Sequence, residues 1–272
     1  MPYVETSAGR VYYQERGAGA PVVLLHATGH DHRDFDGIVD GLAAGHRTIA
    51  LDWPGHGRSD PIDERFGTAM AFAAVLGEVV ERLGLDRAVL IGNSVGGYAA
   101  ARFALERPDQ VAGLVLVNTG GFVDPTPLTR LFCRVLGTPR LARLLWPRLV
   151  KSYMKARNEL DRAVSERAAE VLGSPAGARV AAGLWRSFAA PDYDLRAEGP
   201  RLGKEVVLVW GAKDTVLPMR AARQATAAIP QATLHTFDTG HVVFASDPTG
   251  FLGLVEPFVQ RTLPARPGVN RP

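Results

Sequence analysis

The sequence predicts an α/β protein whose mostly parallel sheet carries helices on both faces and a helical insertion. Three observations support this prediction. Aliphatic runs of strand length alternate with helix-length segments through the first half of the chain. Those runs are apolar at nearly every position, which is typical of strands buried on both faces. The alternation stops near residue 122 and resumes near residue 206, so we expect the segment between them to be helical.

The individual elements follow from periodicity and turn signals. Alternation at 11–15, followed by the turn GAGAP, indicates a hairpin strand. Continuous aliphatic runs predict buried strands, which we expect at 22–25, 48–51, 88–91, 111–117 and 206–210, and the last strand is expected at 232–237. Apolar residues that recur every three or four positions predict helices, which we expect at 35–42, 69–83, 98–106, 219–229 and 244–262. The proline-rich residues 264–272 are expected to be a flexible tail.

Composition and charge exclude several classes of function. The chain has 272 residues, 46% of them hydrophobic and 22% charged, which is ordinary for a soluble globular protein. Its net charge of +3 is too small to indicate nucleic-acid binding. The lone Cys133 rules out an internal disulfide and fits a reducing compartment. With no signal peptide and no apolar run near the ~20 residues of a membrane span, we expect a cytoplasmic protein.

The sequence AVLIGNSVGG at 88–97 places Ser94 between a buried strand and a helix. A strand that becomes a helix within two residues needs a tight turn, and the glycines around Ser94 leave room for a strained apex. Such a turn presents the hydroxyl at the carboxyl edge of the sheet, near amides and the positive end of the helix. This geometry suits nucleophilic attack on a carbonyl, although G-x-S-x-G alone is also common as a plain glycine-rich turn.

A serine hydroxyl needs a base, and the base needs a group that orients it. His241 in TGHVVF and Asp214 in WGAKDTVLP each follow a predicted strand, so both are expected at the same sheet edge as Ser94. An aspartate in such a loop also serves as a turn former or helix cap. The order serine, aspartate, histidine, each after its own strand, favours a catalytic triad.

The other histidines fit structural roles better. His235 lies inside a predicted strand, His46 precedes a strand at the opposite edge and is expected to be solvated, and His56 lies in the turn PGHG. His30 and His32 form an H-x-H fragment, but no further ligands follow at the spacing that a metal site needs. We therefore expect no metal, and a polar loop with His30 at the rim of a substrate pocket.

Five stretches together resemble the α/β-hydrolase fold superfamily, in particular its epoxide-hydrolase-like and esterase-like group. They are LLHATGHDH, DWPGHGRSD, IGNSVGG, WGAKDTVLP and TGHVVFASDP. The resemblance implies the α/β-hydrolase fold, with an eight-stranded sheet and a helical cap inserted over the active site. It implies a core made of residues 1–121 and 204–263 and a cap made of residues 122–203.

The resemblance also implies an oxyanion hole. In the family, the loop after the third strand usually begins His-Gly and the next residue donates an amide. Here Ala27 replaces the glycine, so Thr28 takes that role, and Val95 provides the second amide. Family members that open epoxides or displace halide carry an aspartate nucleophile, and Ser94 argues against both reactions. Ser246 stands where the family often has a glutamate, which we expect to change helix packing more than chemistry.

The insertion is rich in arginine, leucine and aromatic residues. Its basic residues between 128 and 157 are most simply the solvated face of an amphipathic helix; a site for an acidic substrate and a docking surface are the alternatives. Trp146 and Trp185 are among the aromatic residues that we expect to cover an apolar pocket and contact the substrate. The substrate is then a small molecule that is partly apolar.

We therefore predict a serine hydrolase that cleaves a carboxylic ester, lactone or thioester through an acyl-enzyme and uses no cofactor. Carbon–carbon bond hydrolysis, another triad-based reaction such as that of a lyase, perhydrolase or cyclase, and ligand binding without catalysis are the alternatives. The GNSVGG motif is similar to that of carbon–carbon bond hydrolases, but their Gly-Pro-Gly oxyanion loop is absent. The sequence predicts no particular oligomeric state.

Overall fold

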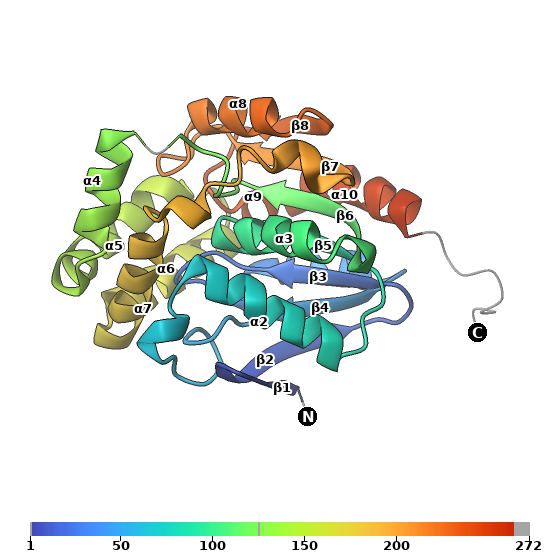
Figure 1. The fold of residues 1–272 in the computed structure, drawn as a ribbon, viewed down its shortest axis with the longest axis horizontal. Helices are drawn as coiled ribbons and strands as arrows, with labels where there is room; N and C mark the ends of the chain where they lie inside the picture. Colours follow the sequence, from blue (N-terminus) through green and yellow to red (C-terminus); the bar gives the residue numbers. More distant parts are fainter. Residues whose placement is uncertain (1, 125, 264–272) are drawn as a thin grey trace.

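A single eight-stranded sheet forms the centre of the molecule (Figure 1). The computed structural model describes residues 2–124 and 126–263, so the predicted tail at 264–272 lies outside the described residues. In spatial order the strands are β1 Tyr3–Thr6, β2 Gly9–Arg16, β4 Arg47–Leu51, β3 Pro21–Leu25, β5 Ala88–Asn93, β6 Val111–Val117, β7 Glu205–Gly211 and β8 Ala232–Phe237. Strand β2 pairs antiparallel with β1 and β4, and the pairs from β4 to β8 are all parallel, which confirms the predicted mostly parallel sheet.

Helices cover both faces of the sheet, as predicted (Figure 1). One face packs against α2 Ala69–Arg82, α3 Val95–Glu106 and α8 Met219–Ala228. The other packs against α1 Val39–Ala43, α9 Val243–Ser246 and α10 Pro248–Thr262. Within the described part of the chain, no helix is both long and apolar enough to cross a membrane.

The two-sided burial explains why the strands are continuously apolar. In β3, Val23 and Leu25 belong to the core on the α2 and α3 side, whereas Val22 and Leu24 belong to the core on the α10 side. All four side chains are fully buried. Successive residues of a strand point to opposite faces, so in a strand covered on both sides both sets of side chains are mostly apolar.

Four helices between β6 and β7 lie beyond the end of the sheet, at the left of Figure 1. We call them the cap; they are α4 Pro127–Leu136, α5 Pro139–Met154, α6 Glu159–Gly173 and α7 Pro175–Ser187. They fall inside the predicted insertion at 122–203. Three of them begin with proline at the first helical position, where its missing N–H is not needed.

Two predicted helices differ from the structure. In place of the helix expected at 35–42, the structure has a 3₁₀ turn at His32–Phe35 followed by the short α1. Gly37 lies between them and packs closely against the cap, since an added Cβ would lie 2.8 Å from Leu160. The helix expected at 244–262 is two helices, because Pro248 cannot continue α9 and instead starts α10.

Candidate functional site

Ser94 lies at the apex of the turn from β5 to α3, with φ 56° and ψ −113°. A positive φ is unfavourable for a residue with a Cβ, so the surrounding chain must hold it in place. The neighbouring glycines allow this because backbone passes close by. An added Cβ at Gly96 would lie 2.3 Å from the carbonyl oxygen of Leu25, and one at Gly92 would lie 2.4 Å from the carbonyl oxygen of Gly96.

Asp214 and His241 form a direct hydrogen bond. Nδ1 of His241 lies 2.5 Å from Oδ2 of Asp214, and the carboxylate is buried. The same carboxylate accepts hydrogen bonds from the backbone N–H groups of Val216 and Leu217 and from the side-chain amide of Asn118. These bonds fix the aspartate and hold the imidazole so that its second nitrogen, Nε2, faces away from Asp214.

Asn93 connects the turn at Ser94 to the loop of His241. Its side-chain amide donates to the carbonyl oxygens of Val117, at 3.0 Å, and His241, at 3.1 Å. The backbone N–H of Ser94 also donates to Val117, at 3.0 Å. The structure thus brings the three predicted residues to one edge of the sheet. No hydrogen bond joins the Ser94 hydroxyl to the His241 ring within the described residues.

The amides of Thr28 and Val95 are both available to an incoming oxygen. Val95 is the first residue of α3, so its N–H has no acceptor within the helix. Neither amide donates to another group in the described part of the chain. Thr28 is buried, and its Oγ1 also has no partner among the described residues. Their role as an oxyanion hole stays a prediction.

The loop that carries Thr28 is anchored by His26. The Nε2 atom of His26 accepts the backbone N–H of Trp53, and its Nδ1 lies 2.7 Å from the carbonyl oxygen of Ala27. The indole of Trp53 donates back to the carbonyl oxygen of His26 at 2.9 Å. Burial lowers the pKa of His26, which keeps the ring neutral and able to accept at Nε2.

A second histidine and aspartate pair lies beside His241. Nδ1 of His30 lies 2.5 Å from Oδ2 of Asp34, and Nε2 lies 2.9 Å from the hydroxyl of Tyr153 at the end of α5. Asp34 also accepts a hydrogen bond from Arg167 of α6 at 3.0 Å. His30 is therefore buried with both nitrogens engaged, and its predicted contact with a substrate stays a prediction.

Tyr153 touches the candidate base twice. Its ring packs edge-on against the His241 ring at 5.2 Å, and its carbonyl oxygen accepts the His241 backbone N–H at 3.0 Å. Burial, together with the charges of Asp34 and Asp214, raises the pKa of Tyr153 well above its usual value. The phenol is therefore a neutral hydrogen-bonding group at the boundary between cap and core.

The two predicted tryptophans continue this aromatic contact into the cap. Successive rings lie 5.2 to 6.4 Å apart along the row His241, Tyr153, Trp146, Trp185 and Phe188. Trp146 and Trp185 are both buried, and neither indole N–H has a hydrogen-bond partner among the described residues. Buried donors without partners are uncommon, since each costs about 1–3 kcal/mol. The cap therefore offers two indole donors to a hydrogen-bond acceptor.

Asp31, His32 and Asp52 form a compact acidic group whose candidate ligand atoms lie within 4.8 Å of one another. Each is already engaged. Asp52 accepts the backbone and ring N–H groups of His32 at 2.8 Å, and also the backbone N–H of Arg58. Burial alone would raise the pKa of Asp31, but its hydrogen bond from Arg33 and the charge of a second arginine lower it below the ordinary range. This group therefore fits an ion-pair network better than a metal site.

Ser246 contacts the cap. Its hydroxyl donates to Oδ2 of Asp161 in α6 at 2.7 Å. Burial raises the pKa of Asp161, and the hydrogen bond from Ser246 partly offsets that effect. A glutamate at 246 would place a second carboxylate against this one, so the expectation that Ser246 affects helix packing agrees with the contact.

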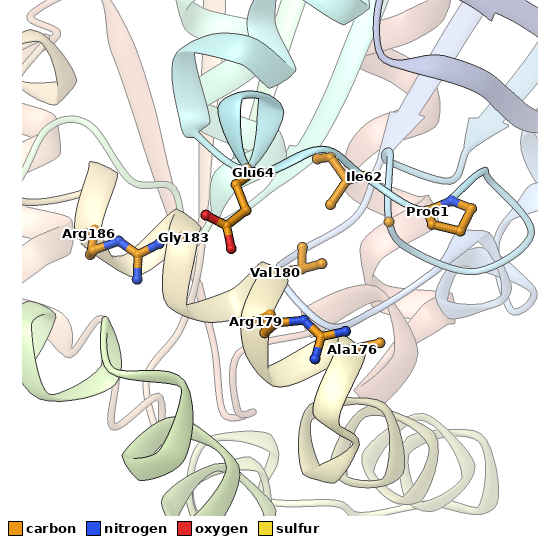
Figure 2. A pocket seen from close by; sticks show the side chains of 10 residues that line it. Pro61, Ile62, Glu64, Ala176, Arg179, Val180, Gly183 and Arg186 are labelled. Carbon is orange, nitrogen blue, oxygen red and sulfur yellow. The ribbon is translucent and has the colours of Figure 1, made fainter.

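One surface depression lies away from these residues. It has a volume of about 130 Å³ and lies between the loop that follows β4 and cap helix α7, between Ile62 and Val180. Figure 2 shows Glu64 extending from that loop toward α7, which carries Arg179 and Arg186. Ser94, Asp214 and His241 do not line it. Ser94 itself is only partly exposed.

Several positioning residues were not predicted from the sequence. Asn118 has φ 40° and binds both the Asp214 carboxylate and the backbone N–H of Gly211, yet in the sequence it only ends an aliphatic run. Asn93 precedes the serine within the quoted motif and could have been singled out for its polarity in a buried strand. Tyr153 was expected only among the residues that cover an apolar pocket, and its hydrogen bond to His30 was not predicted, because His30 lies 123 positions earlier in the chain.

The chain is similar in sequence to named proteins and similar in fold to solved structures. A protein from Klebsiella pneumoniae subsp. pneumoniae, named 2-hydroxy-6-oxononadienedioate/2-hydroxy-6-oxononatrienedioate hydrolase, is 30% identical over 270 residues, which cover 93% of this chain and 91% of that protein. Among solved structures, an esterase from Thermogutta terrifontis has a TM-score of 0.82 at 22% identity, covering 96% of this chain and 98% of that chain. The enol-lactonase from Burkholderia xenovorans has a TM-score of 0.82 at 20% identity, covering 95% and 100%.

The family match agrees with the fold. Residues 20–248 match the family described as alpha/beta hydrolase fold, a range that runs from β3 to the start of α10. It includes all the residues discussed above as the candidate site. The chain therefore belongs to the alpha/beta hydrolase fold family.

Proposed function

We propose that this protein is a serine hydrolase that cleaves an ester-like bond (a carboxylic ester, lactone or thioester) of a small, partly apolar molecule. The observation that carries the proposal is the 2.5 Å contact between His241 and a buried, four-fold hydrogen-bonded Asp214, at the same sheet edge as Ser94. A histidine held in this way is oriented to act as a base through Nε2. Ser94 is the nucleophile within that edge, on a strained turn.

The proposed reaction has two halves. Nε2 of His241 takes the hydroxyl proton of Ser94 as its oxygen attacks the carbonyl carbon, and the amides of Thr28 and Val95 stabilise the oxyanion. The imidazolium, stabilised by Asp214, then protonates the leaving oxygen or sulfur as its bond to carbon breaks. In the second half, His241 takes a proton from water, the hydroxide attacks the acyl-serine, and the serine recovers its proton as the acid is released.

The cap supports a substrate with an apolar part and a hydrogen-bond acceptor. The aromatic row from Tyr153 to Phe188 provides apolar contact area, which rings supply efficiently. The indole N–H groups of Trp146 and Trp185 provide donors that no described residue satisfies. An aryl or branched acyl group that carries a carbonyl or ether oxygen would match both features.

Substitution of the serine tests the proposal. The wild-type protein should hydrolyse members of a panel of p-nitrophenyl esters, lactones and thioesters, and a fluorophosphonate probe should label it. Ser94→Ala should lose the labelling and at least about 10³-fold in kcat. Ser7→Ala is a matched control, because its exposed hydroxyl bonds Glu78 and none of the candidate site residues. Undiminished turnover and labelling of the Ser94→Ala protein would exclude Ser94 as nucleophile.

Carbon–carbon bond hydrolysis is the second candidate. It is favoured by the relatives at about 30% identity that are named as hydrolases of 2-hydroxy-6-oxo dienedioates. In that case a vinylogous diketone would be turned over faster than simple esters, with the same dependence on Ser94. Faster cleavage of esters would favour the first proposal. A non-catalytic receptor would instead bind a ligand tightly with negligible turnover on the entire panel.

A further inference from the structure

Exposed leucines are concentrated on two helices of the cap. In the described part of the chain, five large hydrophobic side chains are exposed, and four of them lie on α4 and α5. Leu128 and Leu131 of α4 are 75% and 56% exposed, and Leu141 and Leu144 of α5 are 42% and 62% exposed. Single exposed leucines are ordinary, but four on two contacting helices form a patch that needs an explanation.

The charged residues of the same helices are all basic. Between Asp124 and Glu159 the chain has eight lysines and arginines and no acidic residue. The whole chain has a net charge of only +3, so the remainder of the chain is net acidic. The exposed cations that flank the leucines are Arg130, Arg134, Arg140, Arg143, Arg148 and Lys151. No carboxylate forms an ion pair with any of these six within the described residues.

Helix α5 separates its two faces clearly. Trp146, Val150 and Tyr153 recur at helical spacing and are buried toward the candidate site. Leu141 and Leu144 lie on the outer side, and α4 lies beside α5 at the outer end of the cap (Figure 1). An amphipathic helix of this kind, with leucines and surrounding arginines on its exposed face, is typical of segments that lie in a lipid interface.

We infer that the α4–α5 surface, defined by Leu128, Leu131, Leu141, Leu144 and the flanking cations, docks on an anionic lipid bilayer. The leucines would enter the boundary between head groups and acyl chains. The arginines have long apolar stems and would reach the phosphates at the level of the head groups. The inference does not depend on the reaction of Ser94.

The charge pattern disfavours the main alternative, a second copy of this chain. A two-fold dimer would place the same surface against itself, because such interfaces are self-complementary. The cations of one copy would then face those of the other without acidic partners. Binding to an acidic protein is also less well matched, since leucine is under-represented among the residues that dominate protein interfaces.

Vesicle sedimentation tests the inference with the full chain. The wild-type protein should pellet with vesicles of phosphatidylcholine containing about one-third phosphatidylglycerol and stay in solution with phosphatidylcholine alone. About 0.5 M NaCl should weaken binding strongly, because it shortens the range of electrostatic attraction. Lack of binding to the anionic vesicles, or equal binding to both, would overturn the inference.

Two sets of variants locate the surface. Exchange of the four leucines for serine should lower the vesicle partition coefficient at least about tenfold. Replacing three of the arginines with glutamine should lower it roughly a hundredfold, at about fivefold per charge; the set is Arg130→Gln, Arg140→Gln and Arg148→Gln. The control set removes the same charge from exposed arginines on α2 and α8 and should retain most of the binding; it is Arg82→Gln, Arg220→Gln and Arg223→Gln.

Folding and self-association are checked in parallel. All the exchanged side chains are exposed, so the melting temperatures should stay close to that of the wild type. If the control set lost as much binding as the cap set, binding would be a non-specific effect of net charge. If light scattering showed a dimer that the leucine variants abolish, the surface would be a contact between copies instead. Either result contradicts the proposed lipid contact.

Discussion

The hydroxyl of Tyr153 lies 2.9 Å from Nε2 of His30, so a buried hydrogen bond joins the end of a cap helix to the loop that follows β3. His30 in turn binds Asp34, and Asp34 binds Arg167 of another cap helix. The cap is thus held to the core by a polar chain rather than by apolar packing alone. Such a chain is sensitive to the loss of any one member, because its neighbours are left buried and unpaired.

Replacing Tyr153 with phenylalanine should destabilise the closed cap. The change removes one hydroxyl and leaves Nε2 of His30 without a partner, which costs about 1–3 kcal/mol. Calorimetry should show a melting temperature lower by about 2–4 °C per kcal/mol, and hydrogen exchange should become faster at the end of α5. Tyr3→Phe, which alters a partly exposed residue of β1, should change neither quantity. Equal effects of the two substitutions would argue against the contact.

Asp214→Asn should reduce turnover on the best ester of the panel by about 10³ to 10⁴-fold with little change in KM. The amide keeps the shape of the side chain but cannot stabilise a charged imidazolium at His241. Circular dichroism should show an intact fold. Asp109→Asn, at an exposed position after α3, serves as the control and should keep full activity. A small loss in kcat for Asp214→Asn would mean that His241 acts without its aspartate.

Gly96→Ala should disrupt the turn at Ser94, because the new methyl group would lie 2.3 Å from a backbone oxygen that cannot move aside easily. We expect a loss of at least about 2 kcal/mol in the free energy of unfolding and a loss of activity. Gly253→Ala provides a control within α10, where an added Cβ meets nothing within 4 Å. It should stabilise the helix by up to about 1 kcal/mol. Urea unfolding of both variants measures the difference.

His56 should make the protein less stable in acid. Burial lowers the pKa of His56 to about 3, because the charged imidazolium would lose its hydration there. An unfolded histidine titrates near 6.5, so between these values the unfolded chain binds a proton that the folded protein does not. Stability should therefore be complete above about pH 6.5 and decrease as the pH falls toward 3.

The substitution His56→Phe tests this assignment, because phenylalanine fills the space beside Phe72 without titrating. Its free energy of unfolding should fall less steeply between about pH 6.5 and about pH 4, by up to about 1.4 kcal/mol per pH unit. At higher pH it should lose only the hydrogen bond to the Pro54 carbonyl, about 1 kcal/mol. Parallel pH curves for the two proteins would show that His56 does not cause the acid sensitivity.

The sequence predicted the features that depend on local pattern. Continuous aliphatic runs identified the parallel strands, since strands such as β3 are buried on both faces. The turn at Ser94 was predictable because only glycines tolerate the close approach of Leu25. Pro248 marks the start of a new helix, as proline often does at the first helical position. The break was not predicted because the apolar periodicity continues across it.

The remaining features depend on contacts between distant parts of the chain. The missed turn before α1 is set by packing of Gly37 against a cap leucine, which no local pattern reports. The burial of His30 was not predictable, because loops with several polar residues are usually solvated. His30 is buried because Asp34 and Tyr153 satisfy both of its nitrogens. Sequence periodicity indicates which side of an element is covered, but not which side chain covers it.

The carbonyl oxygen of Tyr153 that holds the backbone of His241 has a consequence for exchanging caps between relatives. A chimera that replaced residues 122–203 with a foreign segment would also replace the acceptor that fixes the loop of the candidate base. Such an exchange would have to return a carbonyl group to the same place above His241. The end of α5 therefore belongs functionally to the core, although it lies within the cap segment.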